Sequence, residues 1–174
     1  MLCVAGCGDG GEAPVAASSS PTTSPSPSSA PTPERSVPIV RASPVPMSMV
    51  AASKKYLEVT RPYNVALERF EKAANSGASV ATLQARARAV AAANLAESRQ
   101  LSAIKWPDKV AAQIRALVRA DVAARPYWLK VAAADSPSEI ARYVKLASAE
   151  SGKAPAAEIR RLLGLPKYDE KDYS

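Results

Sequence analysis

The chain has 174 residues, of which 47% are hydrophobic, 22% are charged and 5% are aromatic, with a formal net charge of +7. This length predicts one domain of ordinary size, and the scarcity of large aromatic side chains disfavours a sandwich or barrel core. The chain has no histidine, and its two cysteines are Cys3 and Cys7. A Ser-His-Asp triad, a Cys-His pair and a histidine-based metal site are therefore excluded, and we expect a protein that is not an enzyme and needs no cofactor or metal.

The positive charge is unevenly distributed along the chain. Residues 1–46 contain two arginines against three acidic residues, a net −1, which leaves +8 for the remainder. A basic domain favours an anionic partner such as nucleic acid, lipid headgroups or an acidic polymer. The positive residues form no run and acidic residues are interspersed among them, a pattern that is also typical of an ordinary solvated surface.

Residues 8–46 have low sequence complexity. Nine of the fifteen prolines lie between residues 14 and 46, and residues 16–33 read AASSSPTTSPSPSSAPTP. Proline blocks helix formation, and serine and threonine offer little to bury. We therefore expect a disordered tether with polyproline II character, whose ends lie roughly 35 Å apart as a flexible coil.

Residues 47–166 have the composition of a helical domain. The first predicted helix covers residues 48–76, with one apolar stripe in alternating spacings of three and four residues. The stripe consists of Met49, Ala52, Tyr56, Val59, Tyr63, Ala66, Phe70 and Ala73. Pro62 predicts a kink or an irregular turn, and Gly77 suits the left-handed position that ends a helix.

Two further long helices are predicted at residues 79–104 and 107–134. Ser79 is a good N-cap for the earlier one, and Pro107 suits the first helical position of the later one. The earlier stripe consists of Val80, Leu83, Ala87, Val90, Asn94, Glu97, Leu101 and Ile104. The later stripe consists of Val110, Ile114, Leu117, Asp121, Ala124, Trp128 and Val131.

A fourth helical segment begins near Pro137, where Ser136 and Glu139 have the spacing of a capping box. Gly152 and Pro155 disturb it, so either one bent helix reaches Leu163 or a short fifth helix follows a break. Residues 167–174 are polar and expected to fray. Short connections between long helices predict an all-α, antiparallel up-down-up-down four-helix bundle. The alternative is an extended pair of helical hairpins that completes its core by dimerising.

Three polar residues interrupt the apolar stripes near the middle of their helices. Antiparallel packing of the second and third helices would bring Asn94, Glu97 and Asp121 to similar levels, as a possible buried polar cluster. Such a cluster could form a paired acid site, and an enzyme using Glu97 and Asp121 would require a bound metal. A structural salt bridge with an arginine such as Arg99, Arg119 or Arg125 fits the pattern better. A small drift of the stripe would instead turn Ala91, Leu95 and Ser98 inward.

The aromatic residues Trp106, Tyr127 and Trp128 lie near helix ends. They could form a ligand-facing patch, but aromatic residues at such positions more often close a bundle. The sequence has no glycine-rich phosphate loop, no nucleophile elbow and no alternation of aromatic and basic residues of the single-strand-binding kind. These patterns give no catalytic residue.

Val4-Ala5-Gly6-Cys7 resembles the lipobox of bacterial lipoproteins, in which the thiol of the cysteine is acylated and a signal peptidase cleaves directly before it. The resemblance implies that Cys7 is the lipidation site, that residues 1–7 are the remnant of a signal peptide, and that residues 8–46 tether the domain to the membrane. A signal peptide needs a basic region and 7–15 apolar residues, yet six residues precede Cys7. Either the reading frame begins upstream of Met1 or the match is accidental.

The whole layout is similar to small helical lipoproteins of high-GC Gram-positive bacteria. In these a tether leads into an alanine- and arginine-rich bundle with a Trp-Pro turn and a Leu-Gly-Leu-Pro end. Trp106-Pro107 and Leu163-Gly164-Leu165-Pro166 carry this resemblance here. It implies an address at the extracytoplasmic face of the cell membrane and little about activity.

The leading hypothesis is a membrane-anchored extracytoplasmic lipoprotein that acts as a non-catalytic binding or structural module of the cell envelope. Its partners would be the lipid bilayer, through acylated Cys7, and an envelope protein, an anionic polymer or a small apolar ligand. No nucleic acid is expected under this hypothesis. The alternative is an intracellular basic helical protein that contacts nucleic acid.

Overall fold

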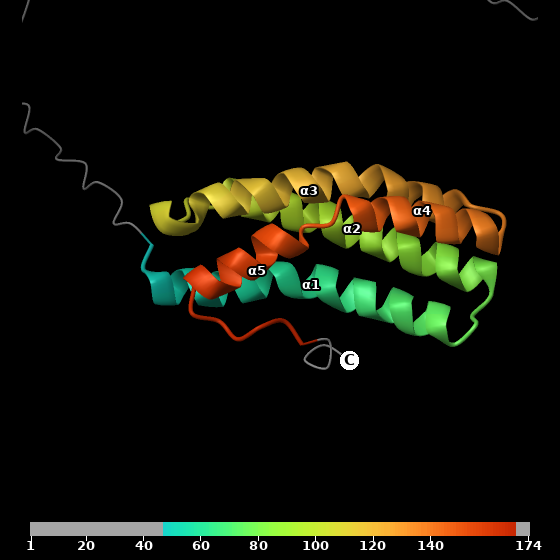
Figure 1. The fold of residues 1–174 in the computed structure, drawn as a ribbon, viewed down its shortest axis with the longest axis horizontal. Coiled ribbons are helices and arrows are strands. Elements are labelled where there is room, and N and C mark those ends of the chain that lie inside the picture. The colour runs from blue at the N-terminus through green and yellow to red at the C-terminus, as the bar shows by residue number, and fades with distance from the viewer. Residues whose placement is uncertain (1–46, 170–174) are drawn as a thin grey trace, which may run out of the picture. The chain divides into compact units, whose positions relative to one another are not determined.

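The computed structural model describes residues 47–169, which form five α-helices and contain no strand (Figure 1). The helices are α1 (Met49–Asn75), α2 (Val80–Ala103), α3 (Asp108–Ala133), α4 (Pro137–Ala149) and α5 (Lys153–Leu162). The predicted all-α class is therefore confirmed for this part of the chain. The predicted signal remnant at 1–7, the tether at 8–46 and residues 170–174 of the polar tail lie outside the described residues.

Serine residues begin three of the helices in this part of the chain. Ser48, Ser79 and Ser136 each have extended backbone angles, and each side chain accepts a hydrogen bond from the backbone N–H three residues further on. These bonds satisfy a donor that the helix itself leaves unpaired. At Ser136 the box is extended, because the carboxylate of Glu139 also accepts from the backbone N–H of Asp135 at 3.1 Å.

The first helix runs without interruption through Pro62, so the expected irregular turn does not form. Pro62 lacks the N–H that would bond to the carbonyl of Glu58, and both residues lie on the exposed face of α1. On an exposed face water can replace the missing bond, which makes the proline tolerable. The predicted end is confirmed: Gly77 adopts φ 70°, and the N–H of Ala78 bonds back to the carbonyl of Ala73 at 3.0 Å.

The third helix begins one residue later than predicted. Pro107 is the N-cap, with an extended ψ of 142°, and Asp108 is the first helical residue. A proline ring fits this position because neither the cap nor the first turn needs its N–H. The connection is closed by Trp106, whose indole Nε1 donates to the carbonyl of Leu101 at 2.8 Å.

The fourth helical segment is broken, so the alternative with a fifth helix is the correct one. Residues 150–152 separate α4 from α5, with Gly152 at the N-terminus of α5. A Cβ built on Gly152 would collide with Cδ1 of Leu117 and lie 3.6 Å from Cβ of Ala120. The link therefore approaches α3 so closely that a side chain at position 152 would require the Leu117 side chain to move.

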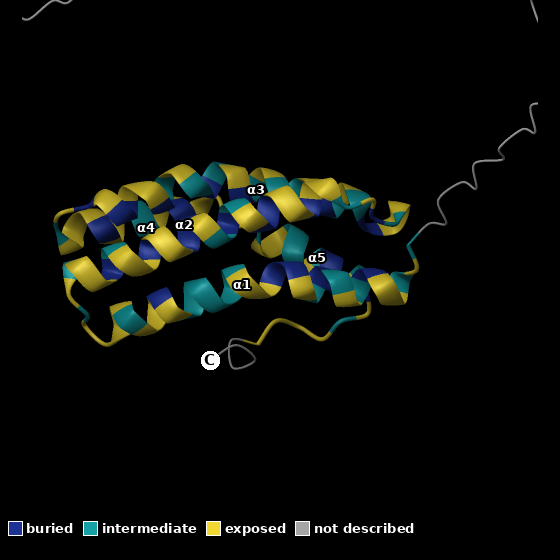
Figure 2. Ribbon diagram, turned by 180° about the vertical axis from the view of Figure 1, so that it is seen from behind, coloured by how far each residue is buried: buried dark blue, intermediate teal, exposed yellow. Residues whose placement is uncertain are grey.

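The helices pack around α3, which contacts α2, α4 and α5, while α1 packs against α2 (Figure 1). Their buried apolar residues form two separate clusters. Figure 2 shows the buried positions in dark blue along the helices. The α4-side cluster consists of Phe70, Leu83, Ala87, Val90, Ala91, Ala124, Trp128, Val131, Ala132, Ala134, Ile140 and Ala147. The α5-side cluster consists of Ala52, Tyr56, Val59, Leu101, Trp106, Val110, Ile114, Leu117, Ile159 and Leu163.

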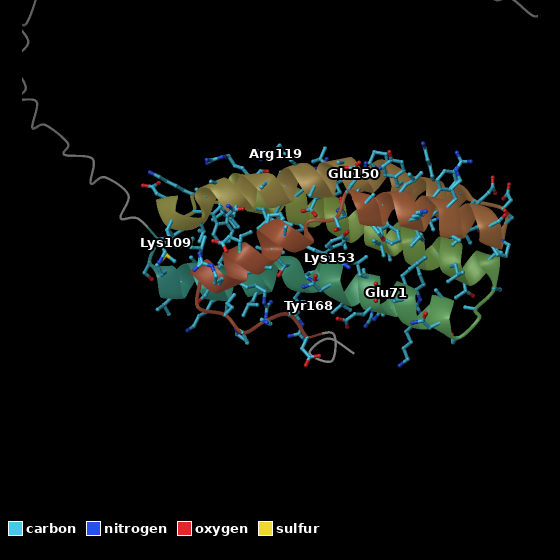
Figure 3. All side chains as sticks on the ribbon, viewed as in Figure 1. Glu71, Lys109, Arg119, Glu150, Lys153 and Tyr168 are labelled. Atoms are coloured by element: carbon cyan, nitrogen blue, oxygen red, sulfur yellow. The ribbon has the colours of Figure 1, made fainter. Side chains whose placement is uncertain are left out.

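The C-terminal segment after α5 is held against the domain. Arg160, which is buried, donates from Nε to the carbonyl of Pro166 at 2.7 Å. The Tyr168 hydroxyl donates to Oε1 of Glu68 on α1 at 2.6 Å, and Figure 3 shows Tyr168 beside that helix. Of the polar tail expected to fray, residues 167–169 fall within the described part, and Tyr168 fixes them to α1.

Candidate functional site

A layer of buried polar residues separates the two apolar clusters. On each long helix the polar residues fall between the last member of one cluster and the first member of the other. We call this set the polar layer; it consists of Thr60 and Tyr63 on α1, Asn94 and Glu97 on α2, and Asp121 on α3. The 150–152 link between α4 and α5 lies at the same level, next to Ala120 of α3. Within the described part of the chain, no helix therefore covers the layer on that side.

The polar layer is deeply buried and poorly satisfied. Asn94 is 0% exposed, and Glu97 and Asp121 are each 3% exposed. Five polar atoms of the layer have no hydrogen-bond partner among residues 47–169: both amide atoms of Asn94, Oε2 of Glu97, Oδ2 of Asp121 and Oγ1 of Thr60. Such atoms are rare in folded proteins because each costs about 1–3 kcal/mol. A cluster of them in one layer marks the place where the fold gives up stability.

The three sequence-predicted residues, Asn94, Glu97 and Asp121, are thus brought into one layer. The expected salt bridge is not formed: no arginine lies within 4.0 Å of either carboxylate among residues 47–169. The stripe also drifts slightly, because Ala91 and Ser98 are buried together with the predicted positions. Leu95, the third residue of the drifted set, is only half-buried, so the predicted stripe with Asn94 and Glu97 remains the centre of the buried face.

Burial and mutual repulsion raise the pKa values of the two acids. Burial raises the pKa of Glu97 well above its ordinary value, and the Asp121 carboxylate raises it further. Burial also raises the pKa of Asp121, to about 7. Without a positive partner, the folded protein favours the protonated forms. The pair therefore takes up protons at a higher pH than two solvated carboxyl groups would.

Tyr63 is the residue of the layer that the sequence interpretation missed, since it was assigned to the apolar stripe. Burial raises the pKa of its hydroxyl, and Asp121 and Glu97 raise it further, whereas the neighbouring Asn94 and Trp128 side chains lower it. Tyr63 is half-buried and packs against the α4-side cluster, at the edge of the polar layer.

The tryptophans belong to the apolar clusters, as expected for residues that close a bundle. Trp128 packs edge-to-face on Phe70 with ring centroids 5.2 Å apart, and Trp106 is buried in the α5-side cluster. Tyr127 is half-buried beside Lys130, whose Nζ lies 5.4 Å from the ring centroid. These contacts provide packing and leave the polar layer as the candidate site.

The polar layer has a limited donor set. Among residues 47–169 no three His, Cys, Asp or Glu side chains come together as a metal site.

None of the five helices is long and apolar enough to cross a membrane. The predicted lipidation site, Cys7, lies outside the described residues.

Comparison of the chain with models of protein families, with curated proteins and with solved structures gives no match. The arguments below therefore use only the residues of this chain and their arrangement.

Proposed function

We propose that this protein is a lipoprotein anchored through acylated Cys7 at the extracytoplasmic face of the cell membrane, where its helical domain acts as a non-catalytic binding or structural module of the envelope. The observation that carries the proposal is Val4-Ala5-Gly6-Cys7 directly before a proline-, serine- and threonine-rich segment. A diacylglyceryl group supplies two acyl chains, and two chains anchor stably where one exchanges.

The start of the folded domain supports this layout. Ser48 caps α1 two residues after Pro46, so the helical domain begins where the low-complexity segment ends. We infer that residues 8–46 are a disordered tether that holds the domain away from the bilayer. A protease of low specificity should remove the tether and leave a resistant fragment that starts between about residues 44 and 54.

We further infer that α4 and α5 together form the fourth wall of an antiparallel four-helix bundle. Ile140 and Ala147 of α4 pack with the C-terminal half of α3, and Ile159 of α5 packs with its N-terminal half. Two short helices in succession therefore occupy the length that one long helix would cover. A monomer in analytical ultracentrifugation would favour this bundle over a pair of hairpins completed by dimerisation.

The basic surface supports an anionic partner in the envelope. Five basic residues are exposed and form no ion pair with another of the described residues: Arg86, Arg115, Arg119, Arg142 and Lys145. Unpaired surface charges attract an anionic polymer at long range, and the attraction weakens as salt screens it. Binding to a polyanion such as polyphosphate at low ionic strength, lost at high ionic strength, is the expected result.

The decisive experiment expresses the gene with its native upstream region and separates membrane from soluble fractions. The wild-type protein should partition into detergent and carry the mass of a diacylglyceryl group, whereas Cys7→Ser should lose both. Cys3→Ser is the matched control, because it removes a thiol four residues away and should leave lipidation intact. An intact, unmodified Met1 in the cytosol would overturn the proposal and favour the alternative of an intracellular protein that contacts nucleic acid.

A further inference from the structure

We propose that the polar layer binds one divalent cation of the oxygen-preferring class, such as Mg²⁺, Mn²⁺ or Ca²⁺, between the side chains of Asn94, Glu97 and Asp121. The inference concerns the interior of the helical domain and is independent of the membrane anchor proposed above. It rests on three features of the layer: oxygen atoms without hydrogen-bond partners, their shared level in the domain, and the charge of two carboxylates.

The first observation is a complete amide with no partner. Asn94 is fully buried, and neither its Oδ1 nor its Nδ2 has a hydrogen bond. One oxygen of Glu97 and one of Asp121 are unpartnered in the same layer. Buried polar atoms in folded proteins are normally satisfied by protein, by ordered water or by an ion. The layer therefore contains three buried oxygen atoms without a hydrogen-bond partner: Oδ1 of Asn94, Oε2 of Glu97 and Oδ2 of Asp121.

The second observation is that these side chains share one level of the domain. Asn94 and Glu97 lie one helical turn apart on α2, and Asp121 lies on α3; on both helices these residues fall between the two apolar clusters. Because α2 packs against α3, three buried polar side chains from two neighbouring helices occupy the level between the clusters.

The third observation is that no ion pair within residues 47–169 neutralises the two acids. Arg125 lies one turn beyond Asp121 on α3, and its Nε is buried without a hydrogen bond, yet it forms no ion pair with another of these residues. Two carboxylates in a low-dielectric core repel each other and need neutralisation by protons or by a cation. A divalent ion neutralises both carboxylates at once.

The donor chemistry selects the class of cation. The layer offers carboxylate, amide and hydroxyl oxygens; the chain has no histidine, and its two cysteines lie in the first seven residues. Hard cations such as Mg²⁺ and Ca²⁺ prefer such oxygen ligands, whereas zinc and copper prefer nitrogen and sulfur. With two carboxylates rather than three, water would complete the coordination, as is common for Mg²⁺.

The 150–152 link between α4 and α5 lies beside the layer. Gly152 packs against Leu117 and Ala120, directly before Asp121 on α3. At this level the protein surface is formed by the 150–152 link rather than by a continuous helix, as Figure 3 shows between the labelled residues Glu150 and Lys153. Local displacement of a short link requires less unfolding than separation of two packed helices.

The test measures thermal unfolding of the full 174-residue chain, with Cys3→Ser and Cys7→Ser to remove thiol ligands. The chain is first treated with EDTA and then titrated with MgCl₂, MnCl₂ or CaCl₂ at about pH 8, where the carboxylates can release their protons. At a hundredfold excess over Kd, one of the three should raise the unfolding midpoint by about 5–10 °C. Electron paramagnetic resonance of Mn²⁺ should give one bound ion per chain.

Two isosteric variants test the site itself. Glu97→Gln and Asp121→Asn keep the shape of the protonated acids and remove repulsion, so both should fold, and each should lose the midpoint shift. Glu150→Gln changes an exposed acid and should retain it. Because protons compete with the cation, the wild-type shift should shrink as pH falls towards about 5.

Three results would overturn the proposal. The first is a wild-type protein whose midpoint no divalent cation shifts, which would indicate a layer neutralised by protons alone. The second is a shift that survives in both Glu97→Gln and Asp121→Asn, which would place binding elsewhere. The third is an Arg125→Gln variant that binds where the wild type does not, because Arg125 would then be the partner of the acids in solution.

Discussion

Gly152 packs directly on Leu117, so closely that a methyl group at position 152 would collide with Cδ1 of that leucine. The backbone of Gly152, at φ −77° and ψ 17°, is accessible to any residue, so the requirement for glycine comes from space and not from a left-handed conformation. The contact holds the link between α4 and α5 against the middle of α3.

We therefore predict that Gly152→Ala lowers the free energy of unfolding by about 1–2 kcal/mol. Overpacking a core costs about 1–3 kcal/mol, and the lower entropy of the unfolded alanine chain offsets about 0.4–1 kcal/mol of this. Urea denaturation measures the change. In a Leu117→Ala background the collision is absent, so the same substitution should be neutral or stabilising; equal costs in both backgrounds would contradict the contact.

The polar layer predicts an unusual pH dependence in the absence of divalent cations. Burial raises the pKa of Asp121 to about 7 and that of Glu97 well above its ordinary value, so the folded state holds protons that the unfolded chain releases between about pH 4 and 7. Stability should thus be fully present below about pH 4 as far as these groups are concerned, and fall as pH rises through 7. Each unit of raised pKa corresponds to about 1.4 kcal/mol.

Urea denaturation in EDTA at several pH values between about 4 and 9 measures this slope. Asp121→Asn should flatten it, because the amide cannot ionise, whereas Asp135→Asn on the exposed turn before α4 should leave it unchanged. Stability that instead rises from about pH 5 to 8 would mean that the acids are paired with a cationic side chain in solution.

The apolar clusters predict a sharp contrast between neighbouring positions on α3. Ile114 is 2% exposed in the α5-side cluster, and Arg115 is exposed on the same turn. Ile114→Asp should unfold the domain, since a buried unpaired charge costs several kcal/mol, comparable with total stability. Arg115→Asp should cost less than about 1 kcal/mol. Circular dichroism melting compares the two, and equal losses would show that the buried face is wrongly assigned.

The C-terminal segment predicts a local effect of Arg160 and Tyr168. Arg160 donates to the carbonyl of Pro166, and Tyr168 donates to Glu68, so residues 165–169 are held by side-chain bonds. Tyr168→Phe removes one bond to a carboxylate and should cost about 1 kcal/mol or less at this exposed site. Hydrogen exchange at residues 165–169 should increase while exchange in α2 stays constant. Unchanged exchange at the tail would show that backbone packing alone holds it.

The helices were predictable because their signals are local. Ser79, Ser136 and Gly77 perform the capping roles that their spacing indicates, and the apolar stripes are the buried faces. The passage of α1 through Pro62 was not predictable from the proline alone. It depends on the exposure of Pro62 and of Glu58, whose carbonyl loses its helical hydrogen bond, and this exposure is a property of the packed domain.

The candidate site was predictable only in its membership. Positions on a stripe place Asn94, Glu97 and Asp121 in the core, since the helical period is known. Whether an arginine reaches them depends on the rotation of α3 and on side-chain conformation, and in the structure none does. Tyr63 was missed because a tyrosine on an apolar stripe looks like any other large residue until its hydroxyl has neighbours.

The division of the C-terminal helical segment into α4 and α5 has a mechanical consequence. With 13 and 10 residues, each helix is too short to persist alone in water, so either one unfolds when it detaches from α3. Ile159 of α5 and its C-cap residue Leu163 share a cluster with Ala52 and Tyr56 in the first turns of α1. A pulling force that enters the domain at Ser48 would therefore be resisted first by this cluster. The stretch of chain around α5, near the C-terminus, therefore sets how much tension applied at the start of α1 the domain can bear before it opens.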